Sequence, residues 1–188
     1  MAELQDYSGQ FRPNLKMTDF SKEALVRLWQ VGGKLYTGLD GLWYSLIRER
    51  FGEDMARELD AELWRRAAPH EVRRNRAAMN IWGDDVEAVL KFIQVDPGGG
   101  AVFPEFDCEL KNRNLGILTI KRCLGLEYYE RHGETELQKH ACEVLDADGF
   151  QQAAAIFNPK IKVRALKLPP RQSKDEIACQ WEFKLVEQ

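Results

Sequence analysis

The chain has 188 residues, a length that fits one domain with a substantial hydrophobic core. Hydrophobic residues make up 44% of the sequence and charged residues 30%, which is the composition of an ordinary soluble globular protein. The formal net charge of −3 argues against a general nucleic-acid-binding protein, which needs a surplus of basic residues. The sequence also lacks the run of roughly 18 apolar residues that a membrane helix needs.

The cysteines bear on the compartment. They are widely separated and form no C-x-x-C pair, at Cys108, Cys123, Cys142 and Cys179. The first ten residues have neither the basic start nor the apolar run of a signal peptide. Together these observations predict free thiols in a reducing compartment, so we expect a cytoplasmic protein.

The N-terminal part begins with an irregular segment and continues as a long helix. Residues 1–17 are polar and show no hydrophobic period, which predicts an arm that is either mobile or packed on the surface. From residue 18 the pattern becomes helical, with Ser21 as the expected N-cap and Gly52 as the end. An apolar stripe runs along this helix through Leu25, Leu28, Trp29, Leu35, Leu39, Leu42, Trp43 and Leu46. Four glycines within the helix predict a bend or a close approach by another backbone or a ligand.

Asp40 lies among those glycines, between apolar residues that include Trp43. A carboxylate in such surroundings must find a hydrogen-bond donor or lose solvation, which raises its pKa. One interpretation is a general base or a group that orients a substrate, with Trp43 beside it. The alternative, which the sequence favours, is a capping or ion-paired aspartate at a helix break.

Two or three shorter helices are expected next, over about 53–67, 69–81 and 84–95, with Pro69 suited to a first helical position. In the first of them, three apolar side chains are expected to pack inward: Met55, Leu59 and Leu63. Five arginines lie between residues 65 and 76, and their planar guanidinium groups suit carboxylate or phosphate ligands. Arg73 and Arg76 are therefore candidates to hold an anionic substrate group. The alternative is a solvated helix face whose arginines pair with glutamates.

Two β-hairpins are predicted in the second half of the chain. Residues 96–100, with the sequence DPGGG, are expected to be a linker that separates the helical part from the sheet. Alternating residues at 105–111 and 117–123, separated by turn residues, predict the first hairpin. Residues 160–168 and 176–185 predict the second, and in its last strand Cys179 should point inward.

Two helices are expected between the hairpins. The first ends at Gly133 and carries four residues that could line a cavity or cover the edge of the sheet: Glu127, Tyr128, Tyr129 and His132. The second is expected at 135–147, with Asp148-Gly149 as its end. Within it, Cys142 and Asp146 are one turn apart and lie outside the apolar stripe, so the pair should face something other than the main core.

The order of elements, helices followed by hairpin, helices and hairpin, predicts an α+β fold in which helices cover an antiparallel sheet. We expect a single domain over 18–188 after the arm at 1–17. Its helical part spans 18–96, and its part with the two hairpins spans 101–188.

Five short motifs follow one another in the second half of the chain: Cys123 at a strand end, Gly-acidic-x-x-Leu at 133–137, Cys-x-x-x-Asp at 142–146, Asn158-Pro159, and Cys-x-Trp-x-Phe at 179–183. This order resembles the L-2-amino-thiazoline-4-carboxylic acid hydrolase family and its uncharacterised bacterial cytosolic relatives. More distantly it is similar to the vinyl-reductase-type and TRAPP-like ligand-binding folds. The resemblance extends weakly to residues 36–44. The chain departs from many relatives at 168–176, where they carry a Gly-Asp-type turn.

The resemblance implies hydrolysis of a small cyclic C–N substrate, such as a thiazoline or amidine-like carboxylate. The pair Cys142 and Asp146 would supply a nucleophile or a water-activating base and a proton donor, and Cys123 could assist. An arginine such as Arg73 or Arg76 would hold the substrate carboxylate.

Two alternatives remain open. The first is a non-catalytic module that binds a small molecule in an apolar pocket between helices and sheet. The second is a metal or cofactor site built from Cys123, Cys142, Asp146 and Cys179, but thiols without paired spacing are weak evidence, so no cofactor is predicted. The expected partner is a small molecule rather than nucleic acid or a membrane, and a homodimer through the long first helix is also open.

Overall fold

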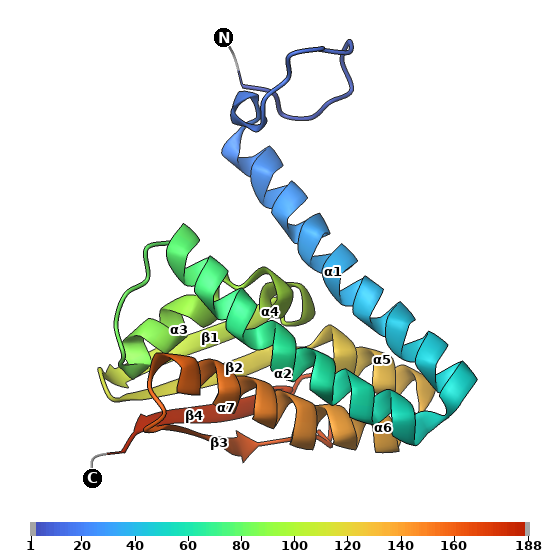
Figure 1. The fold of residues 1–188 in the computed structure, drawn as a ribbon, viewed down its shortest axis with the longest axis vertical. Coiled ribbons are helices and arrows are strands. Elements are labelled where there is room, and N and C mark those ends of the chain that lie inside the picture. The colour runs from blue at the N-terminus through green and yellow to red at the C-terminus, as the bar shows by residue number, and fades with distance from the viewer. Residues whose placement is uncertain (1–2, 187–188) are drawn as a thin grey trace.

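The computed structural model of the protein describes residues 3–186. It has an α+β fold in which helices cover one face of a four-stranded antiparallel sheet, as the sequence predicted (Figure 1). The strands are β1 (Glu105–Asn112), β2 (Leu115–Arg122), β3 (Ile161–Lys167) and β4 (Cys179–Leu185), in the spatial order β1-β2-β4-β3. The helices that follow α1 (Lys22–Phe51) are α2 (Glu53–Ala78), α3 (Val86–Val95), α4 (Pro97–Val102), α5 (Leu124–His132), α6 (Thr135–His140) and α7 (Asp146–Phe157).

Both predicted hairpins are present, and β2 pairs with β4 to join them. Burial alternates along β2 and β4, so one face of the sheet is covered and the other is more open. Cys179 lies on the covered face, as expected. None of the helices within residues 3–186 combines the length and the apolar character needed to cross a membrane.

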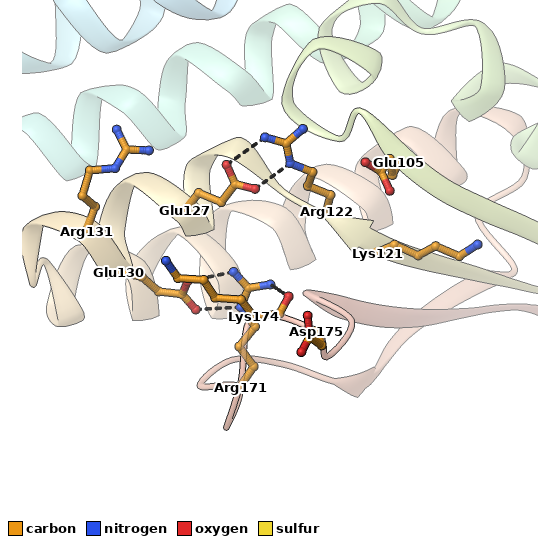
Figure 2. Close-up of a pocket in the computed structure, with 9 residues that line it drawn as sticks. All are labelled: Glu105, Lys121, Arg122, Glu127, Glu130, Arg131, Arg171, Lys174 and Asp175. Carbon is orange, nitrogen blue, oxygen red and sulfur yellow. Dashed lines mark hydrogen bonds and ion pairs between the residues drawn. The ribbon is translucent and has the colours of Figure 1, made fainter.

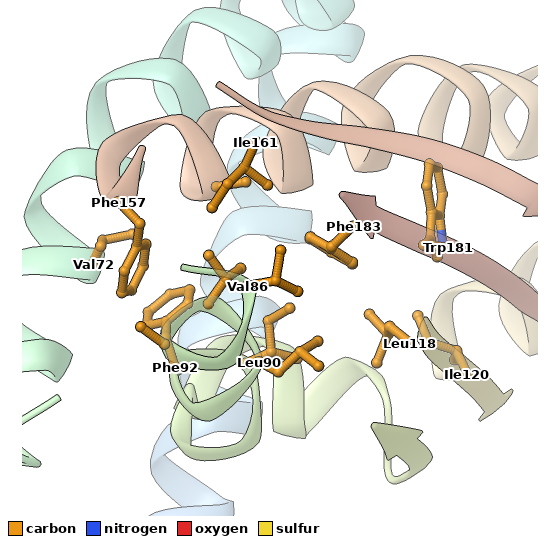
Figure 3. Packing of buried hydrophobic residues seen from close by; sticks show 14 of the residues in the cluster. Val72, Val86, Leu90, Phe92, Leu118, Ile120, Phe157, Ile161, Trp181 and Phe183 are labelled. Atoms are coloured by element: carbon orange, nitrogen blue, oxygen red, sulfur yellow. The ribbon is translucent and has the colours of Figure 1, made fainter. Parts of the chain in front are cut away.

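The hydrophobic core lies between the sheet and helices α2, α3 and α7 (Figure 3). Leu118 of β2 and Trp181 of β4 are paired in register and are almost completely buried. Burial of one such side chain stabilises the fold by about 1.5–3 kcal/mol. Gly116 of β2 lets α3 approach closely, because a Cβ there would lie 2.5 Å from the Leu90 side chain.

Helix α1 begins and ends where the sequence indicates. The Ser21 hydroxyl accepts a hydrogen bond from the Ala24 N–H at 3.2 Å, and Gly52, with φ of 90°, ends the helix. The helix is continuous over 30 residues. Gly33 provides the predicted close approach, because a Cβ there would lie 2.5 Å from the Pro97 carbonyl oxygen of α4.

Residues 96–100 are not a linker. The Asp96 carboxylate caps α4 by accepting a hydrogen bond from the Gly99 N–H at 2.6 Å, and Pro97 occupies the first helical position. These start signals, together with packing against α1, outweigh the low helix propensity of three consecutive glycines.

The expected boundary before Pro69 is also wrong, because α2 continues through Pro69 to Ala78. Proline removes one backbone hydrogen bond from the helix. Helix α2 nevertheless packs against α1 and α7, and just after Pro69 its Glu71 accepts a 2.7 Å hydrogen bond from the Tyr36 hydroxyl of α1. Met55 and Leu63 are exposed rather than packed inward.

The expected helix end at Asp148-Gly149 is wrong as well. Helix α6, a π-helical segment η2 (Ala141–Leu145) and α7 form one continuous helical run that ends at Phe157. Gly149 lies inside α7, which packs against α2 and β3. This tertiary packing overrides the local stop signal.

The described part of the N-terminal arm packs on the end of α1. Leu4 forms a parallel bridge with Phe20, and the rings of Tyr7 and Phe20 meet edge to face with centroids 6.3 Å apart. The leucine stripe predicted along α1, in contrast, does not face the core: Leu28, Leu35, Leu39, Leu42 and Leu46 are all exposed.

Candidate functional site

Three thiols and one carboxyl group converge at one end of the sheet. Cys123 follows β2, Cys179 begins β4, Cys142 lies in the π-helical segment η2, and Asp146 begins α7. Asp146 is close enough to the three thiols for its charge to raise the pKa of each thiol. The sequence placed Cys142 and Asp146 together. The fold adds Cys123 and Cys179 to form what we call the thiol–carboxyl cluster.

The three thiols make different contacts. The Cys123 sulfur accepts a hydrogen bond from the Leu126 N–H at 3.4 Å and caps α5. The Cys179 sulfur accepts one from the indole N–H of Trp181 at 3.2 Å. The Cys142 sulfur has no hydrogen-bond partner within residues 3–186. Cys123 and Cys179 thus support the fold through these bonds, whereas the thiol of Cys142, a buried residue, makes none.

Burial dominates the electrostatics of the cluster. Desolvation raises the pKa of Asp146 to about 7. Burial, followed by the charge of Asp146, raises the pKa of Cys123 to about 11 and that of Cys142 further still. No salt bridge to Asp146 forms in the part of the chain that the structure describes. At neutral pH the thiols are therefore protonated, whereas both the protonated and the ionised form of Asp146 are populated.

The π-helical segment determines which way these side chains face. One-turn π-helical bulges inside α-helices occur frequently at functional sites. Here the segment directs Cys142 toward the sheet, where it is buried. His140, one residue before the segment, faces α2 instead, because burial and the charges of Arg57 and Glu53 are what change its pKa.

A cavity of about 320 Å³ opens beside Cys142. Its walls include Tyr129 of α5, Lys139 of α6, and Pro169 and Pro170 of the turn before β4. Burial and the nearby Asp146 raise the pKa of Tyr129, so its phenol keeps its proton at neutral pH. The cavity thus joins a free thiol, a phenol and an ammonium group.

A larger cavity of about 570 Å³ lies next to it, and Glu130 lines both (Figure 2). Its charged side chains largely pair with one another: Arg171 forms two 2.8 Å bonds to Glu130, and Arg122 binds Glu127 at 2.6 Å. Arg171 anchors the 168–176 turn to α5 and so holds Pro169 and Pro170 at the smaller cavity. We therefore assign a structural role to the residues that line the larger cavity, and we regard the smaller cavity as the candidate site.

Asp40 and Trp43 lie elsewhere, on α1, and line neither cavity. Asp40 meets Asp60 of α2, and each carboxylate has one buried oxygen without a hydrogen-bond partner in the described chain. Burial and the charge of Asp60 raise the pKa of Asp40 to about 7, and burial raises that of Asp60 to about 6. Asp40 is thus a desolvated carboxylate, and no capping bond or cation accounts for it.

The two candidate arginines are also distant from the cavities. Arg73 donates to the Pro69 carbonyl oxygen at 2.9 Å on the exposed side of α2. Arg76 donates to the carbonyl oxygens of Ile81 and Gly83, and its guanidinium group lies 4.2 Å from the centre of the Phe157 ring. These contacts fasten the connection between α2 and α3, so Arg76 is engaged in structure.

Tyr128 is exposed and packs against His132, with ring centroids 4.4 Å apart, while its neighbour Tyr129 lines the cavity. Within residues 3–186, no group of three or more histidine, cysteine, aspartate or glutamate side chains is arranged to hold a metal ion. Cys123, Cys142, Asp146 and Cys179 are therefore neighbours without the geometry of a ligand set.

Comparison with known proteins gives a family but no activity. Residues 18–185 match a family of unknown function (DUF6125). The chain belongs to that family. No curated protein and no solved structure matches the chain. The match covers the helical part, both hairpins and every residue of the thiol–carboxyl cluster, and it carries no statement of substrate or reaction.

Sequence reasoning named Tyr129 among the residues that could line a cavity, but it missed two residues at these sites, namely Lys139 and Asp60. Asp60 carried a usable signal, because it falls in a series with a spacing of four along α2, with Ala56 before it and Ala68 and Val72 after it. All of these positions are buried. Lys139 carried no such signal, because its place at the cavity depends on how α6 meets the turn at 168–176.

Proposed function

We propose that the protein hydrolyses a small cyclic C–N substrate, of the amidine-like carboxylate type, in the cavity beside Cys142. The observation that supports this most is the Cys142–Asp146 pair, in which a carboxyl group with a pKa of about 7 lies beside a thiol at the cavity wall. A pKa near the working pH suits a general base that later returns its proton as an acid.

The pKa values favour water over the thiol as the nucleophile. Because the pKa of Cys142 is raised by burial and by Asp146, the thiol is a weak nucleophile in the free protein. In the proposed reaction, ionised Asp146 takes a proton from water as the water oxygen adds to the amidine carbon. Protonated Asp146 then gives this proton to the ring atom as the bond between that atom and the amidine carbon breaks, which opens the ring. The added hydroxyl loses its remaining proton to solvent as it becomes the carbonyl oxygen of the product.

The charges around the cavity fit a substrate with two opposite charges. A protonated amidine would offset the unpaired charge of Asp146 and lower the pKa of that group in the complex. Lys139 lines the same cavity, together with Glu130 and Glu143, and is the basic candidate there for the substrate carboxylate. It takes the role that the sequence assigned to Arg73 or Arg76, which line neither cavity.

One observation favours a second candidate function, which is binding without turnover at the same cavity. All three thiols hold their protons, since burial raises the pKa of Cys123 to about 11 and that of Cys179 to about 12. Two prolines and a tyrosine provide apolar contact area at the wall. A small ligand could therefore be held there by contact and one salt bridge.

The test is incubation of the full chain with 2-amino-thiazoline-4-carboxylate, with the ring-opened product followed by mass spectrometry. We expect product from the wild type and none above background from Asp146→Asn. The matched control is Asp148→Asn, an exposed aspartate on the same helix, which should leave turnover unchanged.

The two functions separate by their results. Saturable binding without product would contradict the hydrolase and support the binding function. Product formation that survives Asp146→Asn would contradict the role of Asp146. Neither binding nor product from the folded wild type would contradict both functions for this class of substrate.

A further inference from the structure

Helix α1 carries apolar side chains on two opposite sides. One side packs against α2 and α4 through residues such as Gly33 and Tyr44, which are buried. At 100° per residue, the leucine stripe lies on the opposite side of the helix. A helix that is apolar on both sides is normally buried on both. The outer side of α1 therefore lacks a covering partner in the described chain.

The stripe has the pattern of a helix-pairing surface. Its six members follow one another at spacings of three or four residues: Leu28, Val31, Leu35, Leu39, Leu42 and Leu46. Each of them is between 47% and 69% exposed. This spacing is the one by which two α-helices interlock side by side.

We propose that this stripe is the interface of a homodimer in which α1 packs antiparallel against α1 of a second copy. The occupant we commit to is a second copy of this chain, because one stripe related by a twofold axis complements itself without any second surface. The proposal is independent of the proposed hydrolase.

The size of the stripe fits such an interface. Its six side chains expose on the order of 600 Å² per chain, near the ~800 Å² that each partner contributes to a standard interface and at the upper end of patches found on monomers. Neighbouring exposed residues such as Val26 would add to this area.

The shape of the molecule leaves room for the second copy. The N-terminal end of α1 extends beyond the sheet and the other helices, so its outer side is open along its length (Figure 1). The described arm packs at the N-terminal tip of α1, as Figure 1 shows, through the Leu4–Phe20 bridge and a hydrogen bond from the Arg27 guanidinium group to the Gln5 carbonyl oxygen. Gly32 and Gly38 lie in open space near the stripe, so neither would obstruct a close approach.

The stripe also defines a register. In an antiparallel pair centred on Thr37, Leu28 lies opposite the partner's Leu46, and Leu35 lies opposite the partner's Leu39. Gly32 then lies opposite the partner's Leu42 and gives that larger side chain space. A parallel pair would instead place each residue opposite its own copy.

The first experiment measures the mass of the full chain in solution by light scattering. We expect twice the chain mass of 21.7 kDa for the wild type and a single chain mass for Leu35→Lys combined with Leu39→Lys. Circular dichroism should show that this variant stays folded, because both residues are exposed. The control is Leu110→Lys on β1, another exposed leucine, which should remain a dimer.

The second experiment tests the direction of pairing through oxidative cross-linking. The variant Leu28→Cys with Leu46→Cys should form a covalent dimer, whereas Leu28→Cys alone should not, because the two copies of residue 28 would be ~27 Å apart along the helix. The wild type controls for the native thiols. A monomeric wild type, dissociation by Leu110→Lys, or cross-linking by Leu28→Cys alone would each overturn the proposal.

Discussion

Two of the places where burial raises the pKa of aspartates differ in what surrounds the carboxyl groups. Asp146 lies beside a free thiol and a phenol that line a cavity. Asp40 and Asp60 face each other between α1 and α2, and neither lines either of the two cavities. A pKa of about 7 at Asp146 and at Asp40 therefore arises from the same physical cause in two different settings.

The difference shows that a raised pKa alone does not identify a reaction site. Structural burial and catalytic burial both disfavour the charged form of a carboxyl group. What separates the two sites is access, because Asp146 lies beside both Cys142 and Tyr129 at the wall of a cavity, whereas Asp60 reaches that wall only through its charge on Tyr129. The predictions below test this distinction.

The largest expected effect is on turnover. Asp146→Asn removes the proposed general base, so we expect the rate of ring opening to fall by at least about 100-fold. Asp60→Asn should leave that rate within about threefold, since Asp60 has no contact with the cavity wall other than the influence of its charge on Tyr129. Equal losses of rate in the two variants, both shown to be folded, would remove the distinction between the sites.

The sequence predicted the parts of this arrangement that depend on local patterns. Alternation in residues 176–185 places Cys179 inward, and the four-residue spacing pairs Cys142 with Asp146. Ser21 and Gly52 bound α1 because capping and a positive φ are local requirements. Such features need only a few neighbouring residues to form.

The rest depends on packing between distant segments. The π-helical segment at 141–145 has no local sequence mark, and α7 then continues through Gly149, which would otherwise end a helix. The pairing of Asp40 with Asp60 requires α1 and α2 to cross at one particular register. Arg76 faces Phe157 only because α7 continues to that residue. A single sequence shows the residue types involved but not these tertiary contacts.

The second prediction concerns the pH dependence of stability. Burial raises the native pKa of Asp40 and of Asp146 to about 7 and that of Asp60 to about 6, whereas the ordinary value is 3.8. Between pH 3.8 and pH 7 these residues therefore hold more protons in the native state than in the unfolded state. The stability that they contribute is fully present below pH 3.8 and is lost as the pH rises through 6 to 7. We therefore expect the free energy of unfolding, measured with urea, to fall between pH 5.5 and pH 8.

The same measurement on a variant isolates the pair between the helices. Asp40→Asn resembles the protonated form, so at pH 8 it should raise the free energy of unfolding by about 1–2 kcal/mol after allowance for solvent screening, and at pH 5.5 by less. The carboxylates with lowered pKa values, such as Glu53 and Glu130, are already ionised across this range and do not contribute to the slope. A stability that rises from pH 5.5 to pH 8 would contradict the burial of these aspartates.

The smallest expected effect separates the thiols by their contacts. Cys179→Ala removes the acceptor of the Trp181 indole N–H in the core, so it should lower the free energy of unfolding by about 1–2 kcal/mol. Cys142→Ala removes a thiol without a hydrogen bond at a cavity wall and should change stability by less than about 1 kcal/mol. Urea titrations at one pH measure both. A larger loss at Cys142 than at Cys179 would mean that Cys142 is a packing residue, and the cavity would then lose its free thiol as a ligand contact.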